Sequence, residues 1–132
     1  SNASRANSWV RRYKMLDETE LEVFRVCEDY VVTGQIQPNH LTAIKEAGFK
    51  SVLCTRPDGE DPGQVDFQIV ASAAAELGME CRKIDVYGHI GITTDNVQAF
   101  VDAWEELPRP IFGYCRSGNR AAVLYRASRS LG

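Results

Sequence analysis

Short apolar segments and amphipathic segments alternate along most of the chain. Apolar and β-branched residues predict strands at Val23–Cys27, Tyr30–Gly34, Ser51–Cys54, Met79–Val86 and Ile111–Tyr114. Apolar residues at helical spacing predict helices that start near Pro38 and that span Val65–Leu77, Asp95–Leu107 and Asn119–Ser130. Strands that alternate with helices are typical of an α/β fold, so we expect a mostly parallel central sheet flanked by helices on both faces.

Turn and capping residues lie at the ends of several of these segments. Asp29 is the predicted turn residue between the first two strands, which we expect to form a hairpin. Asn39 is the predicted cap of the helix that follows Pro38, and Gly48 is predicted to end that helix. Thr93 or Thr94 is predicted to cap a later helix.

Composition narrows the class of protein. A chain of 132 residues is long enough for one domain with a real core. Its net charge of −3, without a basic stripe, argues against nucleic acid as a partner. No apolar stretch is long enough to cross a bilayer, and no secretory signal is visible, so we expect no membrane partner either.

Residues 1–20 differ in character from residues 21–132. Ser1, Asn2 and Ala3 are interpreted as the remnant of a removed expression tag. Residues 4–20 are polar and charged, and we expect either a linker or an arm docked on the domain. Residues 21–132 are expected to form that domain. The chain ends almost directly after the last predicted helix, so we expect the domain to belong to a longer protein with further domains.

The four cysteines indicate a reducing compartment. Cys27, Cys54 and Cys81 lie in strand-like segments and are predicted to be buried thiols. No Cys-x-x-Cys pair occurs and the chain has only two histidines, so no zinc spacing is present. We therefore expect no metal and no cofactor, and a cytoplasmic location.

Cys115 stands where a predicted strand stops. The residues after it, Arg116, Ser117, Gly118 and Asn119, form a loop that leads into a helix. The free N–H groups and the positive end of that helix favour an anion. Arg120 adds a planar fork that fits two oxygens of a phosphate-like group. The same field favours thiolate over thiol, so we interpret Cys115 as a nucleophile.

The residue types of this loop support two reactions. In the first, Cys115 attacks the phosphorus of a phosphate ester, and water hydrolyses the thiophosphate. In the second, Cys115 attacks sulfane sulfur and carries it as a persulfide to a thiol acceptor. Both reactions need a thiolate in a cradle of amides, and both remain open at this point.

Two further loops are expected at the same edge of the sheet, because they also follow the carboxyl ends of strands. The loop over residues 55–63 carries Arg56, Asp58 and Glu60, which are either solvated turn residues or part of the site. The loop over residues 87–93 carries His89. Arg56, His89 and Tyr114 are candidate pocket-lining residues, and Asp85, Asp58 and His89 are the candidate general acids.

Three motifs in order resemble a known family. Thr33-Gly34-Gln35, then Arg56-Pro57-Asp58-Gly59-Glu60, then Cys115-Arg116-Ser117-Gly118-Asn119-Arg120, resemble the bacterial beta-lactamase-hydrolase-like, phosphatase-like domain family over residues 21–131. The resemblance implies a fold similar to dual-specificity phosphatases. It also implies Cys115 as nucleophile, Arg120 as phosphate-binding residue and the amides of residues 116–120 as pocket lining, with Asp85 near the spacing of the acid in those enzymes.

Two departures from the tyrosine-phosphatase signature keep sulfur transfer by Cys115 as an alternative. Four residues separate Cys115 from Arg120 where that signature has five, and Tyr114 stands where it has histidine. A four-residue spacing resembles the active loop of rhodanese sulfurtransferases, and some relatives are fused to persulfide-handling metallo-hydrolase domains. We expect a phosphate-ester hydrolase first, a sulfurtransferase second and a non-catalytic anion-binding module third.

Overall fold

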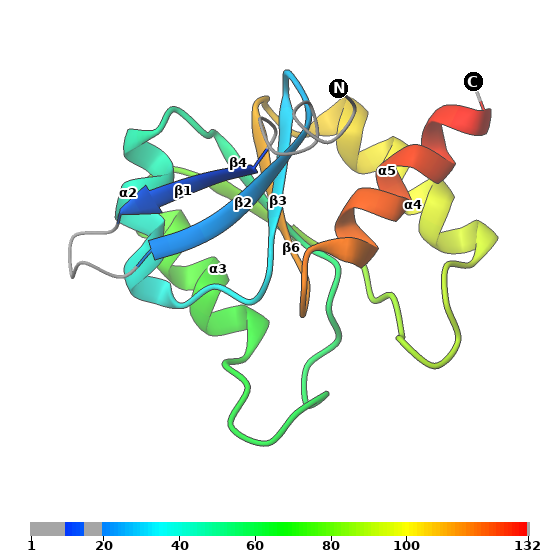
Figure 1. Cartoon of the computed structure of the whole chain (residues 1–132), viewed down its shortest axis with the longest axis horizontal. Helices are drawn as coiled ribbons and strands as arrows, with labels where there is room; N and C mark the ends of the chain where they lie inside the picture. Colours follow the sequence, from blue (N-terminus) through cyan, green and yellow to red (C-terminus); the bar gives the residue numbers. More distant parts are fainter. Residues whose placement is uncertain (1–9, 15–19, 132) are drawn as a thin grey trace.

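A six-stranded, mostly parallel sheet forms the centre of the molecule (Figure 1). The computed structural model describes residues 10–14 and 20–131. The strands are β1 (Val10–Lys14), β2 (Glu20–Cys27), β3 (Tyr30–Thr33), β4 (Ser51–Cys54), β5 (Glu80–Lys83) and β6 (Ile111–Tyr114). They lie in the order β1-β2-β3-β6-β4-β5. The pairs β1–β2 and β2–β3 are antiparallel and the others parallel, which confirms both the hairpin and the α/β class.

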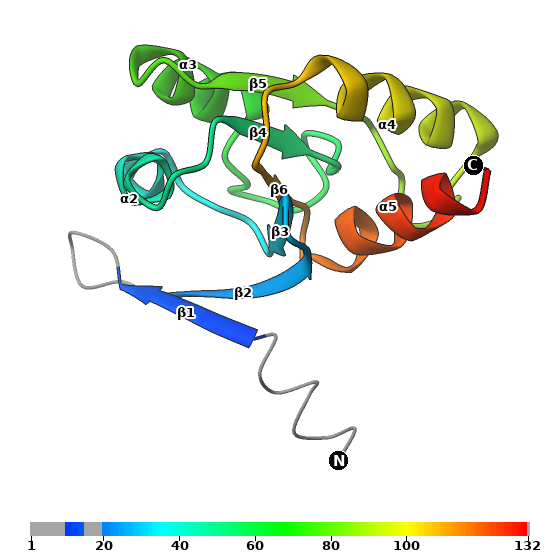
Figure 2. The ribbon, with the colours of Figure 1, turned by 90° about the horizontal axis from the view of Figure 1, so that it is seen from above.

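Helices cover both faces of this sheet (Figure 2). A short 3-10 helix, η1 (Pro38–His40), runs into α2 (Leu41–Glu46), and the longer helices are α3 (Phe67–Glu76), α4 (Thr94–Glu106) and α5 (Asn119–Leu131). One apolar core lies between the sheet and α2 and α3, and the other lies between the sheet and α4 and α5. Adjacent residues of a strand face opposite sides, so Val52 joins the core beneath α2 and α3 while Leu53 joins the core beneath α4 and α5.

Tyr30 fixes the start of α5 against the sheet. Its ring is fully buried and lies 5.6 Å from the ring of Tyr125 and 5.6 Å from that of Phe100. Its hydroxyl donates to the carbonyl of Ala121 at 3.1 Å. Gly113 leaves the room for this ring, because a Cβ there would come within 2.6 Å of the Tyr30 hydroxyl oxygen. The helix that follows the Cys115 loop is therefore held in a set place.

Two local predictions are wrong. The N-cap of η1 is Gln37 and that of α2 is His40, so Asn39 is not the cap. Instead the N–H of Gln37 donates to Nδ1 of His40 at 2.9 Å. Strand β5 is shorter than expected, because its partner β4 ends at Cys54. The capping prediction for Thr93 is confirmed, since its hydroxyl accepts the N–H of Asn96 at 3.1 Å.

The predicted linker or arm falls partly outside the described residues. Residues 10–14 form β1 at the edge of the sheet, whereas residues 4–9 and 15–19 are not described. All four cysteines are free thiols. Cys54 is buried as predicted, but Cys27 and Cys81 are only half-buried, because each packs at the margin of a core. Within the described residues, no helix has the length and apolar character needed to span a membrane.

Candidate active site

The Cys115 loop curls around the sulfur atom. Cys115 directly follows β6, and its N–H donates to the carbonyl of Thr33 at 3.3 Å. The N–H of Gly118 donates to Sγ of Cys115 at 3.0 Å. Helix α5 begins one residue later, which confirms the order of strand, loop and helix. The Cys115 side chain is buried, so the sulfur lies beneath the loop with a backbone donor directed at it.

Two glycines allow the loop to lie directly on the end of β3. Gly118 has φ +94°, a conformation that favours glycine, and a Cβ there would come 3.2 Å from the carbonyl carbon of Thr33. A Cβ on Gly34 would come 2.9 Å from the carbonyl oxygen of Arg116. The Thr-Gly-Gln motif thus has a physical reason, because its glycine lets the Cys115 loop approach the sheet.

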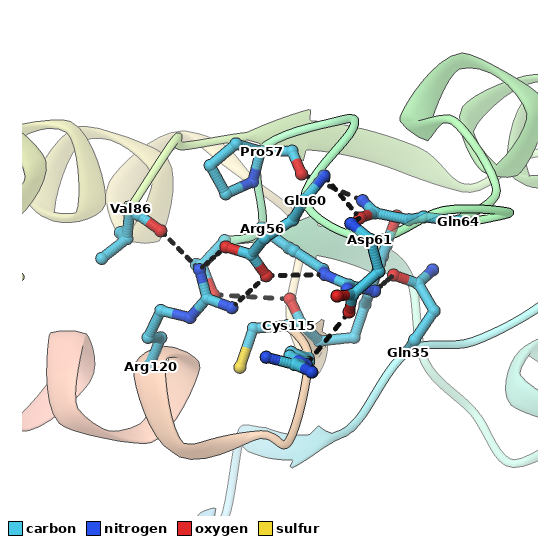
Figure 3. Close-up of polar contacts among 12 residues, drawn as sticks. Gln35, Arg56, Pro57, Glu60, Asp61, Gln64, Val86, Cys115 and Arg120 are labelled. Atoms are coloured by element: carbon cyan, nitrogen blue, oxygen red, sulfur yellow. Dashed lines mark hydrogen bonds and ion pairs between the residues drawn. The ribbon is translucent and has the colours of Figure 1, made fainter. Parts of the chain in front are cut away.

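The guanidinium of Arg120 forms a bidentate ion pair with the carboxylate of Glu60. Its Nη1 and Nη2 donate to the two oxygens of Glu60 at 2.7 Å each, and Nη1 also donates to the carbonyl of Val86 at 2.6 Å (Figure 3). Hydrogen bonds to Glu60 raise the pKa of Arg120, and the nearby sulfur of Cys115 acts in the same direction. The two-oxygen grip that the sequence predicted for a phosphate-like group is therefore made here by Glu60.

A second arginine holds Glu60 from the other side (Figure 3). Arg56 is only 4% exposed, and its Nε donates to Glu60 Oε1 at 2.9 Å. Its Nη1 donates to Gln35 at 2.9 Å and its Nη2 to Asp61 at 2.5 Å. Asp61 also pairs with Arg116 at 3.1 Å. These charges alternate along one chain of contacts, which we call the ion-pair relay: Arg116, Asp61, Arg56, Glu60 and Arg120.

The ion-pair relay and its neighbour Gln35 bring together the three sequence motifs. Gln35, which accepts from Arg56, comes from the first motif, Arg56 and Glu60 come from the second, and Arg120 comes from the third. Arg56 and Glu60 are not solvated turn residues, because Arg56 is buried and Glu60 joins it to Arg120, and their role as site residues stays a prediction. Sequence reasoning missed Asp61, which lies just beyond the second motif, and it gave Gln35 no contact, because the partner of Gln35 is 21 positions away in the sequence.

Glu60 is unsuited to donate a proton. Hydrogen bonds from Arg120 lower the pKa of Glu60 to about 2, with a further contribution from Arg56 that burial only partly opposes. The carboxyl group is therefore ionised at neutral pH. It is therefore suited to pair with the two arginines rather than to protonate a leaving group.

The two candidate acids share one lysine. Nζ of Lys83 lies 3.1 Å from Asp85 and 3.4 Å from Asp58. Burial alone would lower the pKa of Lys83, but these two carboxylates raise it. Asp58 also accepts the N–H of Phe67 at 2.8 Å, where α3 begins. The catalytic roles of Asp58 and Asp85 stay predictions, since these contacts join them to Lys83 rather than to Cys115.

The two remaining candidates for the pocket differ. His89 is exposed in the loop after β5, with its ring 6.0 Å from that of Tyr87, and its role stays a prediction. Tyr114 does not line the pocket: its ring is buried in the core beneath α2 and α3, whereas Cys115 belongs to the core beneath α4 and α5. The reason is the alternation of side chains along an extended chain. Burial raises the pKa of Tyr114 well above its usual value.

Comparison with known proteins identifies relatives over most of the chain. The family model described as "Beta-lactamase hydrolase-like protein, phosphatase-like domain" matches residues 22–132. A beta-lactamase hydrolase-like protein from Agrobacterium fabrum is 34% identical over 111 residues, which are 84% of this chain and 26% of that protein. A protein of the same description from Xylella fastidiosa (strain Temecula1) is 29% identical over 108 residues, 82% of this chain and 25% of that protein. The chain thus spans about a quarter of the length of these curated relatives.

Solved structures share the fold. A candidate phosphatase from Neisseria meningitidis Z2491 superposes with a TM-score of 0.73 and 24% identity, over 80% of this chain and 75% of that one. The core catalytic domain of the PP-IP phosphatase Siw14 from S. cerevisiae, solved with citrate, superposes with a TM-score of 0.64 and 18% identity, over 83% of this chain and 65% of that one. At these identities the likeness concerns the fold, which is that of dual-specificity-like phosphatases.

Proposed function

Because the chain belongs to the beta-lactamase hydrolase-like protein, phosphatase-like domain family, which its three motifs predicted, we propose that it hydrolyses phosphate monoesters with Cys115 as nucleophile. The observation that carries this proposal is the Gly118 N–H directed at Sγ of Cys115 at 3.0 Å, at the N-terminus of α5. A backbone donor and a helix N-terminus favour a thiolate over a thiol.

The reaction has two steps. In the first, the Cys115 thiolate attacks phosphorus, a P–S bond forms, and the ester P–O bond breaks to release an alkoxide or phenoxide that takes up a proton. In the second, water attacks phosphorus, the P–S bond breaks, and inorganic phosphate and the thiolate are released. The amides of residues 116–120 and the guanidinium of Arg120 stabilise the charge on the equatorial oxygens.

The contacts of the candidate acids predict a preference among esters. Asp58 and Asp85 both pair with Lys83, so proton donation to the leaving oxygen is expected to be weak. Esters whose leaving group is stable as an anion need such donation least. We therefore expect aryl phosphates to be hydrolysed faster than alkyl phosphates, with a steep dependence on the pKa of the leaving group.

A direct assay tests the proposal. Wild-type protein should release p-nitrophenol from p-nitrophenyl phosphate and should be inhibited by vanadate, and Cys115→Ser should remove turnover. Cys81→Ser, on another free and half-buried thiol, is the matched control and should keep it. Acid quenching followed by mass spectrometry should find a phosphoryl group on Cys115. Turnover that survives in Cys115→Ser would contradict the proposal.

Sulfur transfer is the second candidate, favoured by the four residues between Cys115 and Arg120 and by the engagement of both candidate acids with Lys83. The thiolate would attack the outer sulfur of thiosulfate, forming a persulfide and releasing sulfite. Cyanide would then take that sulfur as thiocyanate and regenerate the thiolate. No leaving oxygen needs a proton in either step.

Running both assays on one preparation separates the candidates. Phenol release without thiocyanate favours the hydrolase, and thiocyanate with one extra sulfur on Cys115 favours the sulfurtransferase. Vanadate binding without either product would assign the domain as a non-catalytic anion-binding module.

A further inference from the structure

We propose that Arg56, which lies outside the anion-binding loop, is a positioning residue that acts through Glu60 to orient the guanidinium of Arg120 toward a bound anion. This inference rests on the proposed function only in assigning Arg120 to the anion. It extends that function by adding a residue from the loop after β4 that does not itself contact the anion.

Arg56 is held on every side of its guanidinium. It is 4% exposed, and its three nitrogens donate to partners from two different segments: Gln35 after β3, and Glu60 and Asp61 after β4. A buried guanidinium that lost one partner would leave a charge poorly compensated. The group is therefore fixed in one orientation, as a positioning residue must be.

Glu60 couples the two arginines. Its Oε1 accepts from Nε of Arg56 at 2.9 Å and from Nη2 of Arg120 at 2.7 Å, and its Oε2 accepts from Nη1 of Arg120 at 2.7 Å. One carboxylate thus accepts hydrogen bonds from both guanidiniums. A shift of Arg56 must move this carboxylate, and the carboxylate sets the tilt of Arg120.

Glu60 belongs to a loop that holds it in place, so it is not an internal anion that an incoming anion displaces from Arg120. Its N–H donates to Oε1 of Gln64 at 3.0 Å, and Nε2 of Gln64 donates to the carbonyl of Pro57 at 2.9 Å. A carboxylate braced from its backbone and by Arg56 is not arranged to leave when an anion arrives. The contacts therefore favour positioning over blockage of Arg120 by an internal anion.

Charge and geometry can be separated experimentally. The relay contains three guanidiniums and two carboxylates, which leaves one positive charge for an incoming anion. Arg56→Lys keeps that charge but lacks the planar guanidinium that bonds Glu60, Gln35 and Asp61 at once. A loss of anion affinity in this variant therefore reports a change in the orientation of Arg120 and not a change in the net charge of the site.

The test is a double-mutant cycle on anion binding. Tungstate is titrated by calorimetry into the Cys115→Ser protein, with and without Arg56→Lys and Arg120→Lys. Arg56→Lys should weaken tungstate binding about tenfold when Arg120 is present, and no more than about twofold in the Arg120→Lys variant. Arg82→Lys, which alters the surface pair of Arg82 with Glu106 at 2.7 Å, is the matched control and should leave binding unchanged.

Each result bears on the proposal. Equal effects of Arg56→Lys in both backgrounds would overturn it, as would tighter binding in Arg56→Lys or no tungstate binding by Cys115→Ser alone. If Arg56→Lys does not fold, Gln35→Ala removes one partner of Arg56 and should weaken binding about threefold, again only beside Arg120. Because turnover is not measured, a protein with this coupling but no hydrolysis would sink the proposed function and leave this inference standing.

Discussion

The loops that follow β4 and β5 both project beyond the sheet near the start of α5, yet they are held differently (Figure 1). The loop after β4, residues 55–66, is braced by side chains: Arg56 is buried among Gln35, Glu60 and Asp61. Gln64 closes it by accepting two backbone N–H groups and donating to a third residue.

The loop after β5 spans residues 84–93, and its outer part, residues 87–91, is held mainly by backbone hydrogen bonds. Tyr87 accepts the N–H groups of Ile90 and Gly91 through its carbonyl, at 3.1 and 2.8 Å. The side chains of Tyr87 and Ile90 are 44% and 61% exposed. It meets the site through the carbonyl of Val86, which accepts from Arg120.

The difference shows that the polar sequence of a loop does not reveal how firmly it is held. Charged residues such as Arg56 and Glu60 stabilise the loop after β4, because they pair where little water reaches them. Apolar Ile90 in the loop after β5 is instead exposed to solvent. The loop after β4 is suited to hold Arg120 in place. In the loop after β5, only the outer residues 87–91 are suited to vary, because the carbonyl of Val86 accepts from Arg120.

Acid should weaken the braced loop most. The folded-state pKa of Glu60 is about 2, below its ordinary value of 4.5, so its contribution to stability is complete above pH 4.5 and is lost as the pH falls through about 2. Glu60→Gln should cost roughly 2 kcal/mol of unfolding free energy at pH 7, after allowance for solvent screening, and almost nothing near pH 2. Urea unfolding at several pH values measures this, with Glu106→Gln in the surface pair as control. A cost independent of pH would contradict it.

Removing the closure of the same loop should have the next largest effect. Gln64→Ala deletes bonds to the N–H groups of Glu60 and Asp61 and to the carbonyl of Pro57, and should cost about 1.5 kcal/mol. Hydrogen exchange of residues 58–64 should speed up while residues 87–92 stay unchanged. Gln98→Ala, which removes a single exposed bond to Asp102 on α4, is the control. Equal exchange changes in both loops would remove the contrast between them.

Asp58 and Asp85 offer a smaller comparison across the two loops, because they share Lys83. Asp58→Asn should cost about 0.7 kcal/mol, since Asp58 also accepts the N–H of Phe67 at the start of α3. Asp85→Asn should cost less. Thermal melts give the stabilities, and kcat for alkyl against aryl phosphates shows whether either variant impairs the leaving group. A cost for Asp85→Asn above that for Asp58→Asn would reverse the comparison.

Ile90→Ser should change stability least, by under about 0.5 kcal/mol, because the side chain is 61% exposed. Its neighbour in the same loop, Val86, is fully buried, and Val86→Ala should cost about 1 kcal/mol through lost packing. Chemical denaturation of both variants measures the difference. A larger cost for Ile90→Ser would mean that this loop is braced by contacts that its exposure does not indicate.

Much of the fold could be predicted from the sequence, since its signals are local. Apolar runs and helical spacing lie within a few residues, and they gave the strands β2–β6 and the helices α3–α5 to within a few residues, with β5 the least accurate. The cap at Asn39 failed because Gln37 and His40 satisfy the turn instead. The thiol, its loop and its helix are contiguous, so their order was also predictable.

Sequence alone determined that a cysteine would end a buried strand, that a glycine loop would follow it, and that a helix would begin at once. Tertiary structure alone decided that Glu60 meets Arg120, sixty positions away, that Gln35 meets Arg56, and that Tyr114 faces away from the sulfur. The physical reason is the distance along the chain over which each kind of interaction acts. Backbone preference and spacing act between neighbours, whereas an ion pair forms only after folding has brought distant loops to the same edge of the sheet.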